Sequence, residues 1–192
     1  MPQAYPMSEP NVYCLFCRSG QEGHVIHSLA GMGHATLAPF VRHWKGRQGR
    51  DAARDRRRLL PGYVFFEQNT NLPGDAAPDW NGIRRINGVI RILEYENGQR
   101  SLRDSDMAFV NWLRSLGSVV EMSLAVRVGS KVSFINGPLR EMQGQVVSVN
   151  SKRKVAAVRF GSGDSLFKTV WCSFEFLEQN ERNTACPIIQ AG

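Results

Sequence analysis

The side chains of this sequence that could perform chemistry do not form a recognisable catalytic set. His24 and His27 lie three residues apart and would share one face of a helix, which is a spacing that two metal ligands can have. No carboxylate or cysteine stands at a convincing third position, so we expect both imidazoles to be exposed to solvent. The sequence also has no phosphate-binding loop, nucleophile elbow or recognisable pair of catalytic acids. We therefore predict a protein that is not an enzyme and that needs no metal and no cofactor.

The spacing of the cysteines also argues against a bound metal ion. Cys14 and Cys17 have CxxC spacing, but a tetrahedral zinc site needs a second close pair, and the other two cysteines are fourteen residues apart. On a β-strand, residues three apart point to opposite faces, which suits neither a shared metal ion nor a disulfide. We therefore expect buried, reduced thiols.

Arginines dominate the segment 44–58, which ends in Arg56, Arg57 and Arg58. The segment has little hydrophobic periodicity, so we predict an exposed, mobile loop. The chain of 192 residues has a formal net charge of +7, which suits a polyanionic partner but also simple solubility. We expect these three arginines to lie near nucleic acid.

A second basic cluster lies in the sequence SKRK, where Lys152, Arg153 and Lys154 form a predicted hairpin turn, followed by Arg159 on the next strand. Adjacent cations at the tip of a hairpin suit contacts to phosphate groups. A solvated turn would have the same composition, so both interpretations stay open.

The elements that must position these residues follow from hydrophobic patterning. Strands are predicted over 11–16, 35–40, 59–67 and 88–95. Ser19 and Glu22 have capping-box spacing before a helix that ends at Gly33, and Asp104 is a suitable N-cap for a helix that ends at Gly117. This order predicts an α+β fold, in which an N-terminal α/β sandwich packs helices against an antiparallel sheet.

The second half of the sequence is predicted to be β-rich. Short strand patterns alternate with Gly and Asn turns at intervals of about ten residues, which is typical of a small β-barrel of five strands. We predict four segments: an N-terminal domain over 11–116, a linker over 117–125, a barrel domain over 126–178 and a flexible tail over 179–192. Frequent valines and glycines argue against a helical form of the barrel.

Three stretches resemble one family in their order and spacing. The resemblance to the KOW motif of NusG-type transcription factors is carried by VGSKVSFINGPLREMQGQVVSVNSKRKVAAVRF. The first and third strands of the NusG N-terminal (NGN) domain are similar to VYCLFCRSGQE and LLPGYVFFE, and the segment that follows them is similar to INGVIRIL. The resemblance covers roughly residues 11–178, and on it the chain is identified as a member of the NusG family.

This resemblance implies a non-enzymatic regulator of transcription elongation. In the family, the NGN domain binds the clamp helices of the large subunit of RNA polymerase through an apolar cavity. Carried over by position, this cavity would be lined by Phe16, Leu60, Tyr63 and Phe65, and Arg18 would lie near the upstream non-template DNA. The KOW barrel recruits a termination factor, a ribosomal protein or RNA.

Within the barrel, Phe160 and Gly161 match the turn that contacts partners in the family. The arginine-rich segment 44–58, the basic hairpin, and the absence of a His-Thr-Thr motif in DWNGIRR favour a specialised paralogue, an antiterminator of the RfaH or LoaP kind. We expect it to promote read-through of pauses and terminators and to contact an RNA hairpin. A general NusG-type elongation factor is the alternative.

The aromatic strand 63–66 also supports an interpretation that does not depend on the resemblance. Tyr63 and Phe65 share one face of the strand, and Val64 and Phe66 share the other. One face must pack on helices, and the second would be an exposed aromatic patch that docks a partner, unless a second layer of helices buries it.

A stand-alone RNA-binding module is a further alternative, because PGYVFFE loosely resembles an RNA-stacking strand. Pro61 and Val64, however, occupy the positions where that motif has a basic and a small residue. No apolar run approaches the length of a membrane span, and the first residues do not resemble a secretory signal. We expect a cytoplasmic monomer that does not bind membranes.

Overall fold

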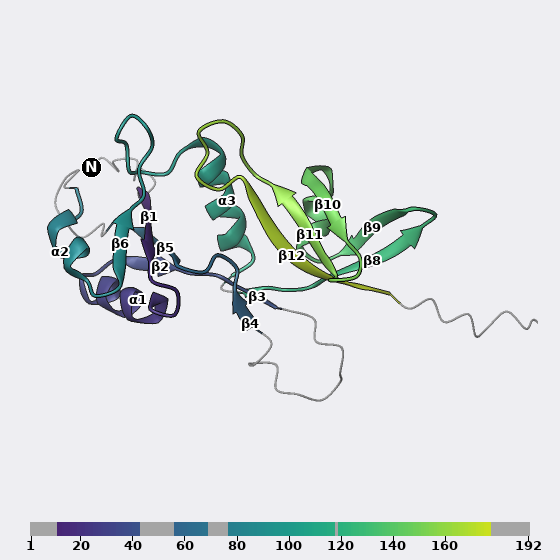
Figure 1. Cartoon of the computed structure of the whole chain (residues 1–192), viewed down its shortest axis with the longest axis horizontal. Helices are drawn as coiled ribbons and strands as arrows, with labels where there is room; N and C mark the ends of the chain where they lie inside the picture. The colour runs from purple at the N-terminus through teal and green to yellow at the C-terminus, as the bar shows by residue number, and fades with distance from the viewer. Residues whose placement is uncertain (1–10, 43–55, 69–76, 118, 178–192) are drawn as a thin grey trace, which may run out of the picture.

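The computed structural model describes residues 11–42, 56–68, 77–117 and 119–177. Two parts rich in β-structure lie on either side of one helix, α3 (Asp104–Ser115), as Figure 1 shows. The α+β class predicted from the sequence is confirmed. Among the described residues, none of the helices has the length and apolarity needed to span a bilayer.

The N-terminal part is built on a four-stranded antiparallel sheet with the strand order β2-β5-β1-β6. Its strands are β1 (Val12–Cys17), β2 (Ala35–Leu37), β5 (Tyr63–Glu67) and β6 (Val89–Ile92). The register pairs Phe16 with Tyr63 and Cys14 with Phe65. Because side chains alternate along a strand, these four lie on one face of the sheet.

Helices cover both faces of this sheet. On one face, α1 (Glu22–Gly31) and α2 (Trp80–Arg85) pack against Leu15, Val64 and Phe66 in a buried cluster. On the other face, α3 contributes Phe109 and Leu113 to the cluster that contains Phe65, Cys14 and their neighbours. The antiparallel sheet with helices against it matches the predicted sandwich.

The starts of α1 and α3 differ from the prediction. Ser19 does not cap α1, which begins after Gln21, and the Glu22 carboxylate instead accepts hydrogen bonds from the N–H groups of Gly20 and Gly62, at 2.8 and 2.7 Å. The N–H of Gly62, in the turn before β5, is therefore a partner of Glu22 that is distant in sequence. Asp104 is the first residue of α3, and the N-cap is the residue before it, Arg103.

Three short strands form a second sheet with the order β4-β3-β7: β3 (Phe40–Arg42), β4 (Arg56–Arg58) and β7 (Val119–Val120). The loop prediction is therefore wrong for residues 56–58, because their backbone pairs antiparallel with β3 and Arg58 stacks on Phe40, with its guanidinium carbon 4.0 Å from the ring centre. The rest of the basic segment, 43–55, lies outside the described residues. The predicted linker 117–125 contains β7, which pairs parallel with β3.

A five-stranded sheet with the order β10-β11-β12-β8-β9 makes up the C-terminal part. Its strands are β8 (Ser123–Val128), β9 (Lys131–Asn136), β10 (Val146–Asn150), β11 (Val155–Arg159) and β12 (Thr169–Phe176). All pairs are antiparallel except β8 with β12. The predicted tail 179–192 lies outside the described residues.

A short helix, α4 (Pro138–Glu141), replaces the turn predicted at NGPL, and a 3-10 turn over Gln143–Gln145 follows it. Pro138 occupies the first turn, where its fixed φ suits a helix and its missing N–H costs little. The N–H of Leu139 donates to the Ser123 hydroxyl at 2.8 Å, and the Leu139 side chain is fully buried. This contact fixes the turn as a helix.

Candidate docking face and basic groove

The four residues predicted to line a polymerase-binding cavity lie together on the N-terminal part. Phe16, Leu60 and Tyr63 are half-buried, and Phe65 is buried. The rings of Phe16 and Tyr63 are 5.0 Å apart between centroids, and all four pack against the same core cluster. We call these four residues the docking face.

Gly62 sets the shape of one edge of the docking face. Its φ of +84° is in the left-handed region, and a Cβ there would lie 2.8 Å from the Cys17 carbonyl oxygen and 2.9 Å from Cε2 of Phe16. The Gly62 carbonyl accepts a hydrogen bond from the Cys17 N–H at 2.7 Å. Glycine at this position therefore lets the turn before β5 approach the end of β1 and the Phe16 ring.

The Glu22 carboxylate holds the same turn by accepting a hydrogen bond from its backbone. Burial raises the pKa of this carboxyl group, but the hydrogen bonds from the N–H groups of Gly62 and Gly20 lower it by more, so the pKa is below its ordinary value. The ionised carboxylate is thus the form that holds the turn.

The docking face is covered by the connection between β11 and β12, residues 160–168, which we call the covering loop. The Phe167 ring lies 5.1 Å from Phe65, 5.7 Å from Tyr63 and 5.5 Å from Phe109 between centroids. Phe160 lies 4.7 Å from Phe109 on α3. The face is therefore closed by α3 together with a loop from the C-terminal part.

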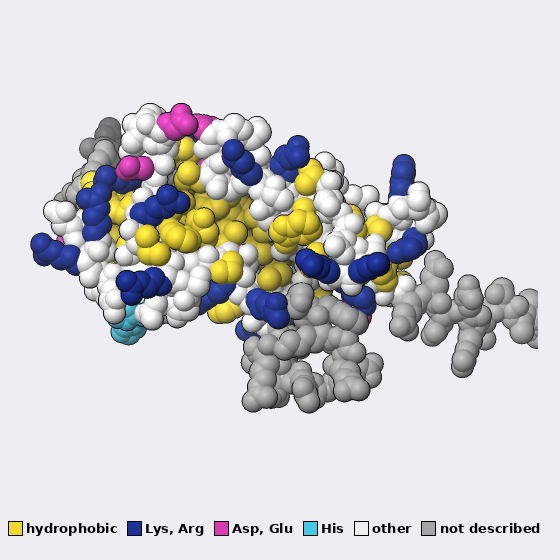
Figure 2. Space-filling view, viewed as in Figure 1, with side chains coloured by type: hydrophobic (Ala, Val, Ile, Leu, Met, Phe, Trp, Pro, Cys, Tyr) yellow, Lys and Arg dark blue, Asp and Glu magenta, His cyan; other side chains and the backbone are white. Residues whose placement is uncertain are grey.

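One core cluster consequently runs through both parts of the molecule, from Phe65 through Phe109 on α3 to Phe174 in the C-terminal sheet. Figure 2 shows hydrophobic side chains gathered across the middle of one face of the molecule, with Lys and Arg side chains around them. The two parts of the chain therefore associate through apolar contacts.

A buried carboxylate, that of Asp106, holds the covering loop on α3. Asp106 is 1% exposed and accepts four hydrogen bonds, from the hydroxyls of Tyr95 (2.6 Å) and Ser165 (2.7 Å) and from the N–H groups of Leu166 (3.0 Å) and Phe167 (3.1 Å). Three of these four donors belong to the covering loop. Burial and the hydrogen bond to Asp106 both raise the pKa of Tyr95, which therefore stays a donor.

Two further contacts hold the loop at its middle and near its start. The Arg103 guanidinium pairs with the Asp164 carboxylate at 2.7 Å on the surface. Gly161 is packed so closely that a Cβ there would lie 2.0 Å from the Ser165 hydroxyl oxygen and 2.9 Å from that of Ser105 on α3. Phe160 and Gly161, predicted to bind a partner, thus contact the N-terminal part in this structure.

The predicted nucleic-acid-binding residues do not form a single cluster. Arg18 and Arg159 are exposed on separate parts of the molecule. Arg58 donates a hydrogen bond to the Ala38 carbonyl at 2.7 Å in addition to stacking on Phe40. Arg58 therefore helps to hold the small sheet together, and Arg56 beside it is exposed.

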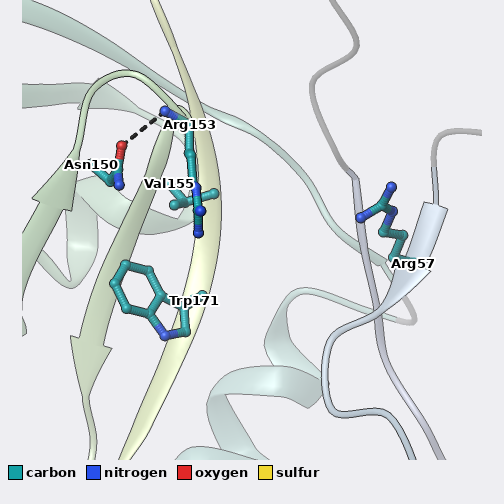
Figure 3. A pocket seen from close by; sticks show the side chains of 5 residues that line it. All are labelled: Arg57, Asn150, Arg153, Val155 and Trp171. Atoms are coloured by element: carbon teal, nitrogen blue, oxygen red, sulfur yellow. Dashed lines mark hydrogen bonds between the residues drawn. The ribbon is translucent and has the colours of Figure 1, made fainter. Parts of the chain in front are cut away.

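Two of the predicted basic residues line the same groove of about 560 Å³, which is formed by Arg57, Asn150, Arg153, Val155 and Trp171. Arg57 comes from β4, whereas the other four come from the C-terminal sheet and its hairpin turn, as Figure 3 shows. Lys152 is exposed next to Arg153, and Lys154 is half-buried in the same turn. The Asn150 side chain accepts a hydrogen bond from the Arg153 N–H at 2.9 Å, which fixes the turn.

Three residues that the structure places at these sites were not predicted from the sequence. Asp106 and Phe167 hold the covering loop, and Trp171 lies in the groove with half of its surface exposed. Trp171 could have been predicted, since it lies between the apolar Val170 and Cys172. Neighbouring side chains of a strand point to opposite faces, so Trp171 belongs to the outer face. Asp106 had no comparable signal.

The predictions of buried, reduced cysteines and of exposed His24 and His27 are confirmed for the described residues. Cys14, Cys17 and Cys172 are free and buried, and burial raises the pKa of all three thiols, that of Cys172 to about 12. His24 and His27 are exposed. Within the described ranges, His, Cys, Asp and Glu side chains form no group that could hold a metal ion.

Comparison with known proteins defines the class to which this fold belongs. The family model described as "Transcription termination factor nusG" matches residues 11–110, just over half of the chain. The chain belongs to the NusG family, whose members are non-enzymatic transcription factors that interact with RNA polymerase.

Among solved structures, one described as "Domain interaction in Thermotoga maritima NusG" is 21% identical, with a TM-score of 0.45. The match covers 85% of this chain and 92% of that one. The sequence comparison with curated proteins gave no match.

Proposed function

We propose that this protein is a transcription elongation factor with antitermination activity, which binds RNA polymerase through the docking face on its N-terminal part. Family membership supports a role in transcription elongation or termination. The observation that carries the proposal is the aromatic character of the docking face, because Tyr63 and Phe65 would lose the cover of Phe167 without the covering loop.

In this proposal, the clamp helices of the large polymerase subunit replace the covering loop on the docking face. Phe167 and the clamp helices would compete for Tyr63 and Phe65, so binding requires the N-terminal unit (11–116) and the C-terminal unit (126–178) to separate. Phe160 and Gly161 would then become available to a second partner, such as a ribosomal protein.

The basic hairpin supports a specialised paralogue that also contacts RNA. Lys152 and Arg153 are exposed at the tip of the β10–β11 hairpin, where phosphate groups can approach them. Replacing Lys152, Arg153 and Lys154 together by alanine is expected to weaken binding to an RNA hairpin and to reduce the salt dependence of the affinity. Unchanged affinity would refute the RNA contact.

Transcription in vitro through a terminator tests the function itself. We expect the full chain to increase read-through, and Tyr63→Ala to reduce this effect together with the affinity for polymerase. Ile90→Ala is the matched control, since Ile90 is an exposed apolar side chain on β6 of the same part. Enhanced termination would instead indicate a general NusG-type factor, and retention of RNA without polymerase in a pull-down would indicate a stand-alone RNA-binding module.

A further inference from the structure

Trp171 is an exposed aromatic side chain in the groove between the two parts of the molecule. It lies on β12 and is 52% exposed, whereas its neighbours Val170 and Cys172 are buried in the core. A large indole surface is therefore available to a ligand on the outer face of the C-terminal sheet (Figure 3).

The strands beside Trp171 present small side chains on the same face. The register places Ala157 of β11 next to Trp171, and Ser148 of β10 next to Ala157. Ala157 is buried, so the surface that this row offers to a planar group is the exposed part of the indole ring itself. A planar group can stack on that part of the indole.

The charge of the groove favours an anion next to this planar group. Arg57 and Arg153 are both exposed, and they enter the groove from different parts of the molecule (Figure 3). Among the described residues, no aspartate or glutamate lines the groove. Its volume of about 560 Å³ is within the roughly 300–1,000 Å³ that is usual for small-ligand sites.

We propose that this groove binds an unpaired nucleotide of single-stranded RNA, with the base stacked on Trp171 and the flanking phosphates paired with Arg57 and Arg153. Every base has a π-face that can stack on an aromatic ring, and arginine binds phosphate with a planar pair of donors. The cationic rim favours this occupant over a protein segment. Unpaired RNA is also the form in which proteins read bases by stacking.

The proposal rests on the proposed function, which brings the protein to the polymerase from which RNA emerges, and it adds to the basic hairpin a defined subsite for a base. The cations of the hairpin tip would bind the phosphates of paired and unpaired RNA alike, whereas a subsite on Trp171 requires a base that is not paired. The two contacts therefore predict different effects of substitution.

Fluorescence anisotropy with a labelled, unstructured RNA of about 12 nucleotides tests the proposal on the full chain. Trp171→Ala is expected to weaken binding about 5- to 150-fold, the equivalent of roughly 1–3 kcal/mol for one stacked base. Trp171→Phe keeps an aromatic ring and should retain most of the affinity. The control Ile90→Ala removes an equally exposed apolar side chain from a distant strand and should change nothing.

The arginines are tested by the salt dependence of the affinity. Arg57→Gln and Arg153→Gln should each lower the slope of log K against log salt concentration by about 0.7, the value for one phosphate contact on a single strand. Arg84→Gln, an exposed arginine on α2, is the matched control and should leave the slope unchanged.

Three results would overturn the proposal: equal RNA affinity of wild type and Trp171→Ala, equal slopes for both groove arginine variants and wild type, or equal affinity for single-stranded DNA of the same sequence. Polymerase binding separates this proposal from the proposed function. Trp171→Ala should bind polymerase as the wild type does, and wild type that binds RNA through Trp171 but not polymerase would refute only the proposed function.

Discussion

Substitution of Asp106 by asparagine should release the covering loop and expose the docking face. The carboxylate accepts hydrogen bonds from the N–H groups of Leu166 and Phe167, one on each oxygen. The amide of asparagine has only one oxygen, so at least one of these two N–H groups loses its acceptor. The hydroxyls of Tyr95 and Ser165 can turn to accept from the new NH₂ group, but a backbone N–H cannot.

The expected cost follows from these contacts. Hydrogen bonds to a charged group contribute about 1.5–3 kcal/mol each. We call the form in which the covering loop has left the docking face the open form. Loss of one such bond should favour the open form by about 2 kcal/mol, which is roughly 30-fold in population. Because affinity rises with the fraction of molecules in the competent form, the apparent Kd for polymerase should fall by up to the same factor.

Hydrogen exchange of the Leu166 and Phe167 amides measures the opening directly, and polymerase binding measures its consequence. Ser162→Ala is the matched control, because Ser162 is an exposed residue of the same loop. Unchanged exchange in Asp106→Asn would refute the role of the carboxylate. Faster exchange with unchanged polymerase affinity would refute the assignment of the docking face.

Three further substitutions test the surrounding structure. Gly62→Ala should lower the free energy of unfolding by at least about 2 kcal/mol, seen as a lower Tm, since φ is +84° and the new Cβ would meet the Cys17 carbonyl. Glu22→Gln should cost about 2 kcal/mol at pH 7. Because the folded pKa of Glu22 is lowered, its stabilisation is present above the ordinary value of 4.5 and is lost as the pH falls through the folded value, so wild type and variant should converge in acid unfolding. Arg103→Ala should change the free energy of loop opening, measured by hydrogen exchange, by less than about 1 kcal/mol, because the Arg103–Asp164 ion pair is exposed. A larger effect would contradict the small contribution expected of this ion pair.

The sheets were the most predictable part of the fold. Continuous apolar runs identified β1 and β5, because both faces of these strands are buried. Short apolar runs between Gly and Asn turns identified the strands of the C-terminal part. The helix at 138–141 was missed because it depends on a hydrogen bond to Ser123, which is distant in sequence. The strand at 56–58 was missed because three arginines resemble a solvated loop until Phe40 is placed beside Arg58.

The candidate site was predictable to a smaller extent. Resemblance to the family grouped Phe16, Tyr63 and Phe65, and the structure brings them onto one face. The cover of that face could not be inferred, because it depends on a contact between Asp106 and a loop about sixty residues further along the chain. Local patterning carries no information about such pairs.

The aromatic packing of Phe167 against Tyr63 and Phe65 also bears on how the free protein behaves at high concentration. Exposed aromatic clusters promote self-association, and the closed form shields this one from other copies of the chain. Variants that open the loop should therefore be less soluble than the wild type in the absence of polymerase. The covering loop would therefore also reduce aggregation of the free protein.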